Sequence, residues 1–253
     1  ELVVSVVAMS KSKKNVVFPD ELIAQYGADT ERLYTLFMGP PEKEIEWSEE
    51  GVRGCYRFLH RFWRVAISII ERTSGTAEEP DPQNFGAKEW EIWGKLHATI
   101  KKVTEEFEGR LALNTAVAAI MELVNALSQY MEDPKADVRL LRRALRDTIL
   151  LLSPFTPFIC EELWHRLGEG KAILETPWPA YDPKALEGGE VEIPVQINGK
   201  LRARLHVPRS LAKDQKALEE LVLQSPVVRE KLGGMRVIRV IAVPEKLVSV
   251  VAK

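Results

Sequence analysis

The chain has 253 residues, of which 45% are hydrophobic and 28% charged, with a formal net charge of −2. This composition is typical of a soluble globular protein with a core of ordinary size, and it excludes a disordered chain. The most apolar run, residues 149–160, contains two prolines and is far shorter than the roughly 20 apolar residues of a membrane-spanning helix. We therefore expect no membrane segment.

Cys55 and Cys160 are the only cysteines of the sequence. Two such residues, far apart in segments with helical periodicity, are a poor basis for a disulfide framework or a zinc site. We predict that both are core thiols, that the chain holds no metal of its own, and that it works in the reducing cytoplasm.

The N-terminus and the distribution of charge give two further expectations. The chain begins with Glu1 instead of methionine, and its first apolar stretch lacks the basic lead-in of a secretory signal, so we expect it to begin inside a larger protein. Residues 190–253 contain twelve Lys and Arg against seven Asp and Glu, whereas residues 1–189 contain 23 against 30. A basic tail on an acidic body suggests an anionic partner at the tail.

The first forty residues combine a predicted strand with a lysine-rich loop. Residues 2–7 are rich in β-branched side chains, which favours a strand, and the run AMSKSKK at 8–14 follows it directly. Two short helices are predicted next, one over 19–26 and one that is capped by Asp29 or Thr30 and continues to about residue 38.

Helical periodicity dominates the middle of the chain. Apolar residues recur at three- and four-residue spacings and predict amphipathic helices over approximately 52–70, 90–103, 113–127, 136–152 and 155–167. Such a series favours an antiparallel bundle. Five tryptophans fall among these apolar positions and are predicted to lie in the core instead of stacking on nucleotide bases: Trp47, Trp63, Trp90, Trp93 and Trp164.

The pattern changes at the Pro- and Gly-rich linker 181–189. Apolar and polar residues then alternate on both sides of Asn198-Gly199, which is the strongest short signal for a hairpin with a type I′ turn. A helix and two more strands are predicted beyond it, over 211–223, 236–243 and 247–251. The predicted fold class is therefore mainly α, with an antiparallel helical bundle followed by a small α+β C-terminal domain.

The loop after the first predicted strand concentrates donors for an anion. Lys11, Lys13 and Lys14 place three ammonium groups within four residues, with Ser10 and Ser12 between them. Such a loop can close over a polyphosphate and neutralise the charge that builds on a leaving pyrophosphate. Taken alone, a short Ser- and Lys-rich segment also fits a solvated linker, so the motif by itself does not decide.

The surroundings of the loop are more specific. MSKSK at 9–13, followed by Asn15, the segments 20–21 and 26–29 and Arg32, resembles the second signature of class I aminoacyl-tRNA synthetases and the helices after it. Further segments, in the same order, resemble bacterial leucyl-tRNA synthetases in particular: 40–42, 46–48, 51–52, 56–59 with Arg61, Trp63 and Arg64, 114–116, 121–123, 153–157, 161–164, 195–200, 243–244 and 246–248. The resemblance covers essentially the whole chain.

This resemblance implies a division of the chain into four parts. Residues 1–40 would be the end of a class I catalytic domain, a strand–loop–helix remnant that carries the signature loop. Residues 41–180 would be a helical bundle of the anticodon-binding type, 181–189 a linker, and 190–253 an α+β domain that grips the elbow of the tRNA.

The resemblance also implies an activity, the ATP-dependent attachment of leucine to tRNA(Leu). The implied catalytic residues are Lys11 and Lys13, and the implied ATP-binding residues are Met9, Ser10, Lys11, Ser12 and Lys13. The His-x-Gly-His element of the family is absent from this sequence, so we expect the chain to be inactive alone. Mg²⁺ and most of the ATP would be bound by a missing catalytic part, or by the larger subunit of a two-chain enzyme.

Two sets of basic residues are candidates for contact with tRNA. Arg57, Arg61 and Arg64 are spaced four and three apart and would line one side of a helix, where they suit phosphates but would equally suit a salt-bridged face. In the tail, Lys200, Arg202 and Arg204 alternate with apolar residues on one predicted strand, so their side chains are predicted to project from the same face of the sheet. Arg209 is the fourth candidate of the tail.

One departure keeps alternatives open. The family signature usually begins with lysine, and this sequence has Ala8 there, so either less charge is needed or Lys14 compensates. The alternatives are another class I ligase, for isoleucine, valine or methionine, and a free-standing, non-catalytic tRNA-binding module. Against the first, the sequence has no cysteine cluster for a C-terminal zinc module and no long heptad tail.

Overall fold

The computed structural model describes residues 7–39, 46–76, 78–109 and 111–253. The chain forms two compact units, one built from Glu1–Asp81 with Lys95–Tyr181 and the other from Pro82–Gly94 with Asp182–Lys253. The first unit is helical and the second contains a small mixed sheet with helices, which confirms the predicted fold class.

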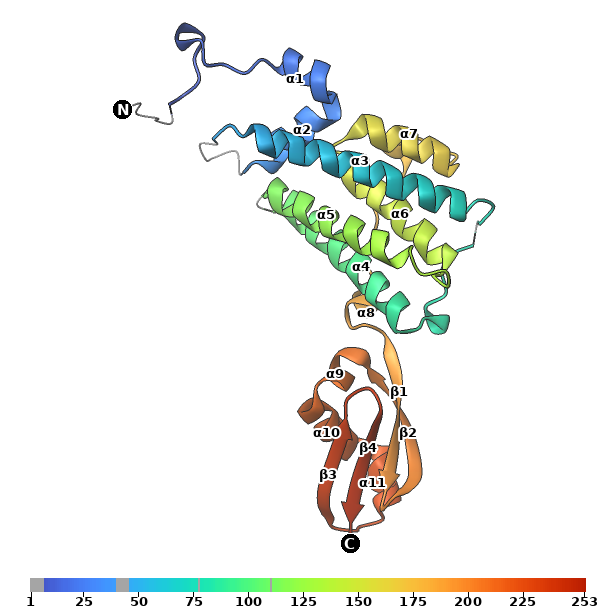
Figure 1. The fold of residues 1–253 in the computed structure, drawn as a ribbon. Coiled ribbons are helices and arrows are strands. Elements are labelled where there is room, and N and C mark those ends of the chain that lie inside the picture. Colours follow the sequence, from blue (N-terminus) through green and yellow to red (C-terminus); the bar gives the residue numbers. More distant parts are fainter. Residues whose placement is uncertain (1–6, 40–45, 77, 110) are drawn as a thin grey trace. The chain divides into compact units, whose positions relative to one another are not determined.

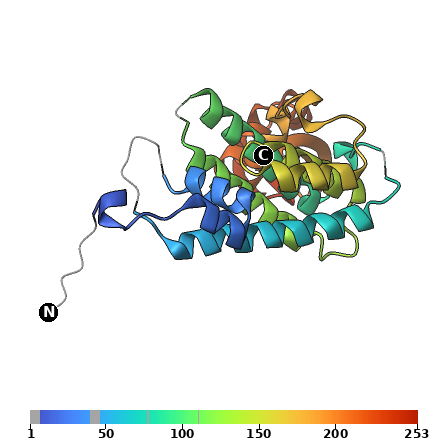
Figure 2. The same cartoon turned by 90° about the horizontal axis from the view of Figure 1, so that it is seen from above.

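The helical unit is a bundle in which successive long helices run in opposite directions (Figure 1). Its helices are α1 (Pro19–Tyr26), α2 (Ala28–Phe37), α3 (Glu49–Arg72), the part of α4 (Ala87–Glu108) from Lys95 onward, α5 (Leu113–Tyr130), α6 (Val138–Leu152) and α7 (Pro157–Leu167). The first part of α4 belongs to the second unit. Helix α3 packs against α5, α6 and α7, and Figure 2 shows α1 and α2 beside its N-terminal part. The core holds fully buried apolar side chains such as Phe62, Leu96, Ile120 and Leu145. Each of them contributes about 1.5–3 kcal/mol by leaving water.

Local capping explains where several of these helices begin and end. The Ser48 hydroxyl accepts a hydrogen bond from the Gly51 N–H at the start of α3, and the Asp137 carboxylate accepts from two N–H groups at the start of α6. Gly168 ends α7 in the left-handed conformation. These polar caps satisfy N–H and C=O groups that a helix leaves unpaired at its ends.

The cap predicted for α2 is wrong. Gly27 stands at the N-cap and no side chain caps this helix. The Asp29 carboxylate instead accepts hydrogen bonds from the backbone N–H groups of Phe158 (3.4 Å) and Ile159 (2.7 Å), in the first turn of α7. Asp29 therefore caps a helix that begins almost 130 positions later, because tertiary packing brings α7 beside the start of α2.

The strand predicted over 2–7 falls almost entirely on residues outside the described ranges. Val7 to Ser10 have no regular structure, and Lys11–Lys13 form a single 3-10 turn. Residues 15–18 have no regular structure, with Phe18 in an extended conformation, and Pro19 occupies the first position of α1.

The second unit contains the sheet β2-β1-β4-β3, in which β1 and β4 are parallel and the outer pairs antiparallel. Its strands are β1 (Glu190–Ile197), β2 (Lys200–Pro208), β3 (Val237–Val243) and β4 (Leu247–Ala252). The predicted Asn198-Gly199 turn is confirmed, since both residues have positive φ, of 50° and 76°. One face of the sheet forms an apolar core with helices α9 (Arg209–Lys213), α10 (Gln215–Gln224) and α11 (Pro226–Leu232).

The single helix predicted over 211–223 is in fact two helices, and α11 was missed. Asp214 interrupts the helical run, and its carboxylate accepts hydrogen bonds from the N–H groups of Lys216 and Ala217 at the start of α10. Ser225-Pro226 ends α10 and begins α11. The apolar periodicity continues across these breaks, so it did not reveal them.

One position of the linker segment, Gly189, accepts only glycine. Pro183–Leu186 form the single turn α8, and Gly189 has a φ of +69°. A Cβ atom on Gly189 would lie 2.2 Å from ring atoms of Trp90. Both the backbone conformation and this close approach therefore require glycine.

Candidate nucleotide and nucleic-acid interfaces

The lysine-rich loop has a defined conformation. The Ser10 hydroxyl accepts a hydrogen bond from the Lys13 N–H at 3.3 Å, and Lys14 has a φ of +53°. The Asn15 side chain closes the loop, because its oxygen accepts from the Ser10 N–H at 2.9 Å and its amide donates to the Ala8 carbonyl at 3.4 Å. One asparagine thus ties the two ends of the loop together.

The loop exposes its cationic groups. Met9, Lys11, Ser12, Lys13 and Lys14 are all exposed. Among the residues that the structure describes, no carboxylate forms an ion pair with the three lysines. Ammonium donors that remain free in this way fit phosphate oxygens, whereas the Ser10 and Ser12 hydroxyls share a hydrogen bond at 3.2 Å. The assignment of the loop to ATP stays a prediction, since no ligand contact tests it.

Three arginines lie exposed on α3, at Arg57, Arg61 and Arg64. The Arg61 guanidinium lies 5.9 Å from the centre of the Phe58 ring. Within the described ranges none of the three forms an ion pair with a carboxylate. Their charge is therefore available to a partner.

The arginines of α6 behave differently. Arg143 pairs with Glu79 and with the fully buried Asp147, and Arg146 pairs with Asp147 and Glu169. Arg139 and Arg142 also have carboxylate partners. Helix α6 is rich in arginine, but its charge is neutralised within the bundle, so it is a structural surface and not a candidate for phosphate binding.

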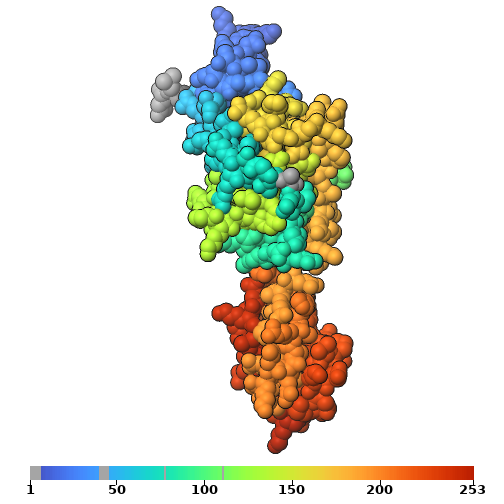
Figure 3. Space-filling view, turned by 90° about the vertical axis from the view of Figure 1, so that its right-hand side faces the viewer, coloured from blue at the N-terminus to red at the C-terminus, as the bar shows by residue number. Residues whose placement is uncertain are grey.

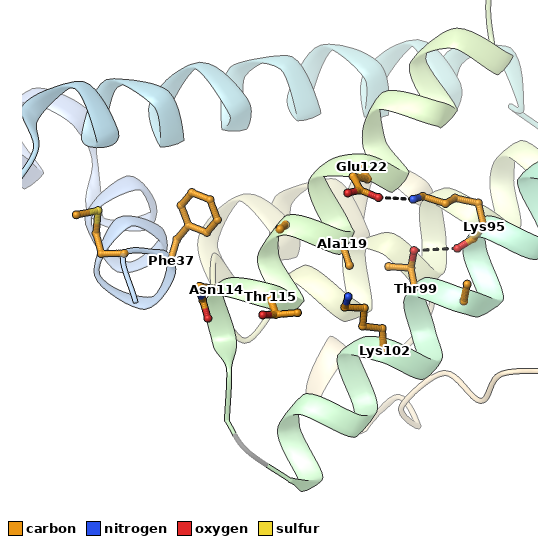
Figure 4. A pocket seen from close by; sticks show the side chains of 11 residues that line it. Phe37, Lys95, Thr99, Lys102, Asn114, Thr115, Ala119 and Glu122 are labelled. Atoms are coloured by element: carbon orange, nitrogen blue, oxygen red, sulfur yellow. Dashed lines mark hydrogen bonds and ion pairs between the residues drawn. The ribbon is translucent and has the colours of Figure 1, made fainter. Parts of the chain in front are cut away.

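A hollow of about 620 Å³ lies between the end of α2, helix α4 and helix α5 (Figure 4). Three charged side chains line it, Lys95, Lys102 and Glu122. Lys95 donates to the Glu122 carboxylate, and this contact lowers the pKa of that group. The Thr99 hydroxyl donates to the Lys95 carbonyl at 2.8 Å. Because Glu122 pairs with Lys95, only Lys102 among the described lining residues remains for an anion, so this hollow is a weaker candidate than the loop or α3, each of which has three exposed cations.

The structure places the tail cations differently from the prediction. The pairing of β1 with β2 shifts between Val195 and Gln196, so that Val195 faces Ala203 and Gln196 faces Leu201. Arg202 is thus the extra residue of a β-bulge, and a bulge reverses the alternation beyond it. Leu201 is 50% exposed as a result, and Lys200 lies opposite the buried Ile197. The prediction that all the strand cations leave one face is therefore wrong.

The tail cations also differ in their partners. Arg204 forms a 2.6 Å ion pair with Glu192 on the neighbouring strand. The Arg209 side chain is only 16% exposed and pairs with Glu245 at 3.3 Å. Lys200 and Arg202 are exposed, and no carboxylate in the described part of the chain pairs with them. These two are the better placed of the four for contacts with phosphate.

Sequence reasoning missed a group of aromatic side chains that line a second hollow of the helical unit. Tyr26, Tyr56, His60, Trp63 and Phe158 border it. Trp63 was predicted to be core, but it is only partly buried, as are Trp47 and Trp90, whereas Trp93 and Trp164 are buried. The spacing of 56, 60 and 63 on one helix was the available signal, but a core stripe has the same spacing.

The buried thiols agree with the prediction. Cys55 and Cys160 are both free and buried, and burial raises the pKa of Cys55 to about 11. Among the described residues, no three His, Cys, Asp or Glu side chains gather as a metal site would require. No helix in the same ranges is both long and apolar enough to span a membrane.

Comparison with known proteins agrees with this arrangement. Residues 89–218 match the family model described as the anticodon-binding domain of tRNA ligase. The chain is 46% identical over 246 residues to a leucine–tRNA ligase of Desulfatibacillum aliphaticivorans and 44% identical over 249 residues to one of Thermotoga petrophila. Each match covers 96% of this chain, but only 28% and 30% of the relative.

A solved structure is similar over nearly the whole chain. It is the crystal structure of the ternary complex of Agrobacterium radiobacter K84 agnB2 LeuRS, tRNA and LeuAMS, with a TM-score of 0.68 and 32% identity. The match covers 97% of this chain and 31% of that one. The chain thus spans about 30% of the length of the proteins it matches. Since the family model matches about half of its residues, the chain belongs to the family of tRNA ligase anticodon-binding domains.

Proposed function

We propose that this chain is the C-terminal part of a leucine–tRNA ligase of the cytoplasm, which joins leucine to tRNA(Leu) at the expense of ATP. The identity of 44–46% to two leucine–tRNA ligases along 96% of the chain supports this proposal, and it favours leucine over isoleucine, valine or methionine. The remaining part of the enzyme, on the same or another chain, would bind leucine, Mg²⁺ and most of the ATP.

The signature loop would act on the phosphates during activation. In that step a carboxylate oxygen of leucine attacks the α-phosphorus of ATP, the bond to the β-phosphate oxygen breaks, and pyrophosphate leaves with the electron pair. Lys11 and Lys13 would neutralise the charge that builds on the leaving group, while Ser10 and Ser12 donate hydrogen bonds and Met9 borders the site. Mg²⁺ on the other part would add further neutralisation.

The observation that carries this proposal is the loop itself. Asn15 fixes its ends through the Ser10 N–H and the Ala8 carbonyl, while the lysines remain exposed and free of carboxylates among the described residues. A solvated linker does not need such a closing interaction. Preorganised cations are the arrangement that stabilises a transition state without reorganisation at the moment of reaction.

The tRNA would lie along the bundle and reach the tail. Arg57, Arg61 and Arg64 would contact its phosphates on α3, and Lys200 and Arg202 would do so on the tail, with smaller contributions from the paired Arg204 and Arg209. Contacts of this kind position the RNA without reading its sequence. Affinity should then fall steeply with salt, and neutralising Arg202 should reduce the slope of log K against log[salt] by about one.

The test is leucine-dependent exchange of pyrophosphate into ATP by this chain joined to the rest of the enzyme. Lys11→Ala should slow exchange about ten- to a thousand-fold, as loss of one transition-state contact does. Lys135→Ala, an exposed lysine outside the loop, is the control and should have no effect. Lys14→Ala shows whether that residue replaces the lysine missing at Ala8.

Two results would count against the proposal. Unchanged exchange by Lys11→Ala would remove the catalytic role of the loop. A wild-type assembly that binds tRNA(Leu) but supports no exchange would identify the chain as a non-catalytic tRNA-binding module.

A further inference from the structure

An aromatic hollow of about 600 Å³ opens on the helical unit where three parts of the chain meet. Tyr26 comes from the end of α1, Tyr56, His60 and Trp63 from α3, and Phe158 from the first turn of α7. In the space-filling view, the first helices lie next to α3 and α7 at one end of the helical unit (Figure 3). We call this hollow the aromatic groove. Its size is that of an ordinary small-ligand site.

The rings of the groove hold one another in place. The Tyr56 ring packs edge-on against Tyr26, with ring centres 5.5 Å apart, and against His60, with centres 4.3 Å apart. Tyr56 is nevertheless 36% exposed, and Phe158 is 67% exposed. One side of Trp63 is occupied by the Arg166 guanidinium at 5.2 Å. The groove therefore offers fixed, partly exposed aromatic surface that loses little freedom when a flat ligand stacks on it.

Cationic side chains run beside the groove along the same helix. Arg57, Arg61 and Arg64 each directly follow one of the three ring-bearing α3 residues of the groove, so the stripe of arginines lies about 100° around the helix from the stripe of rings. They are exposed, and no carboxylate of the described chain pairs with them, in contrast to the arginines of α6. The helix thus carries an aromatic stripe next to a stripe of free positive charge.

We propose that the aromatic groove receives an unstacked base of the tRNA, while Arg57, Arg61 and Arg64 hold the adjoining phosphates. This inference rests on the proposed function. Rings beside guanidinium groups are the chemistry that recognises unpaired nucleotides, because a base that has left the stack offers its faces to aromatic side chains. A continuous duplex presents phosphates but no free base face, so it would engage the arginines and leave the groove empty.

The test measures binding of this chain to a tRNA(Leu) transcript and to a fully paired RNA duplex of equal length. Tyr56→Leu should weaken tRNA binding about 5- to 100-fold, the range for loss of one base–aromatic stack. It should leave the slope against salt unchanged and should not affect the duplex, because stacking releases no counterions. Tyr56→Phe, which retains the ring, should bind tRNA within about twofold of wild type.

Two further variants complete the design. Tyr181→Leu removes a ring of the same unit that is 39% exposed and lies outside the groove, and it should bind both RNAs as wild type does. Arg57→Gln should reduce the salt slope by about one on both RNAs.

The outcomes separate this inference from the proposed function. If the wild-type chain does not bind tRNA(Leu), the proposed function fails. If it binds but Tyr56→Leu matches Tyr181→Leu, or weakens tRNA and duplex equally, the groove does not receive an unstacked base and the inference alone is wrong. An unchanged salt slope for Arg57→Gln would overturn the role of the arginines.

Discussion

Replacing Asp29 by alanine tests the contact that ties the start of α2 to the start of α7. The two N–H groups that donate hydrogen bonds to this carboxylate belong to Phe158 and Ile159. The residue at the N-cap of α7, Thr156, makes no capping bond of its own, so nothing nearby replaces Asp29. Losing an N-cap costs about 1–2 kcal/mol.

This magnitude predicts a local effect that hydrogen exchange can detect. The protection of the Ile159 amide should fall about 5- to 30-fold in Asp29→Ala, since 1–2 kcal/mol corresponds to that ratio. Asp214→Ala removes the equivalent cap of α10 in the other unit and should leave Ile159 unchanged. Equal Ile159 protection in wild type and Asp29→Ala would show that the carboxylate does not hold α7.

The same residue gives a dependence on pH with a definite sign. Burial raises the pKa of Asp29 by more than the hydrogen bonds from Ile159 and Phe158 lower it. When the pKa is higher in the folded chain than in the unfolded one (about 3.9), the contribution to stability is full below the unfolded value and is lost as pH rises through the folded value. Wild type should therefore gain stability relative to Asp29→Asn as the pH falls from 7 toward 4, and a gain in the opposite direction would contradict this reasoning.

Three more predictions concern stability and reactivity. Gly189→Ala should lower the free energy of unfolding of its unit, measured by urea titration, by about 2–4 kcal/mol, because the new Cβ strains the backbone and collides with the indole of Trp90. The loss should be smaller for Gly199→Ala, because φ is +76° there but no atom lies within 4 Å of the added Cβ. Asp147→Ala leaves Arg143 without its buried partner and should cost about 3 kcal/mol by the same measurement. Both cysteine thiols should resist Ellman's reagent in the native chain and react after denaturation, so that early reaction of Cys55 would disprove its burial.

Much of the fold could be read from local sequence signals. The long helices of the bundle follow from apolar periodicity together with caps such as Ser48 and Asp137, and the hairpin follows from Asn198-Gly199. These features depend on residues close in sequence, so a pattern of a few positions contains the information. The family resemblance and the lysine-rich loop were visible for the same reason.

Contacts between distant segments could not be read in this way. The hydrogen-bond partners of Asp29 lie in α7. The arginines of α6 are neutralised by carboxylates such as Glu79 and Glu169, whereas no carboxylate in the described ranges pairs with the exposed arginines Arg57, Arg61 and Arg64 of α3. The bulge at Arg202 depends on how two strands pair, not on the composition of either.

The sequence by itself determined the long helices of the bundle, the hairpin, the lysine-rich loop as a sequence motif and the family, because each is encoded in short-range pattern. Only the tertiary structure decided which cations remain free and which rings come together in the aromatic groove. The physical reason is that pairing of charges and exposure of rings depend on which elements pack side by side, and one-dimensional spacing does not contain that.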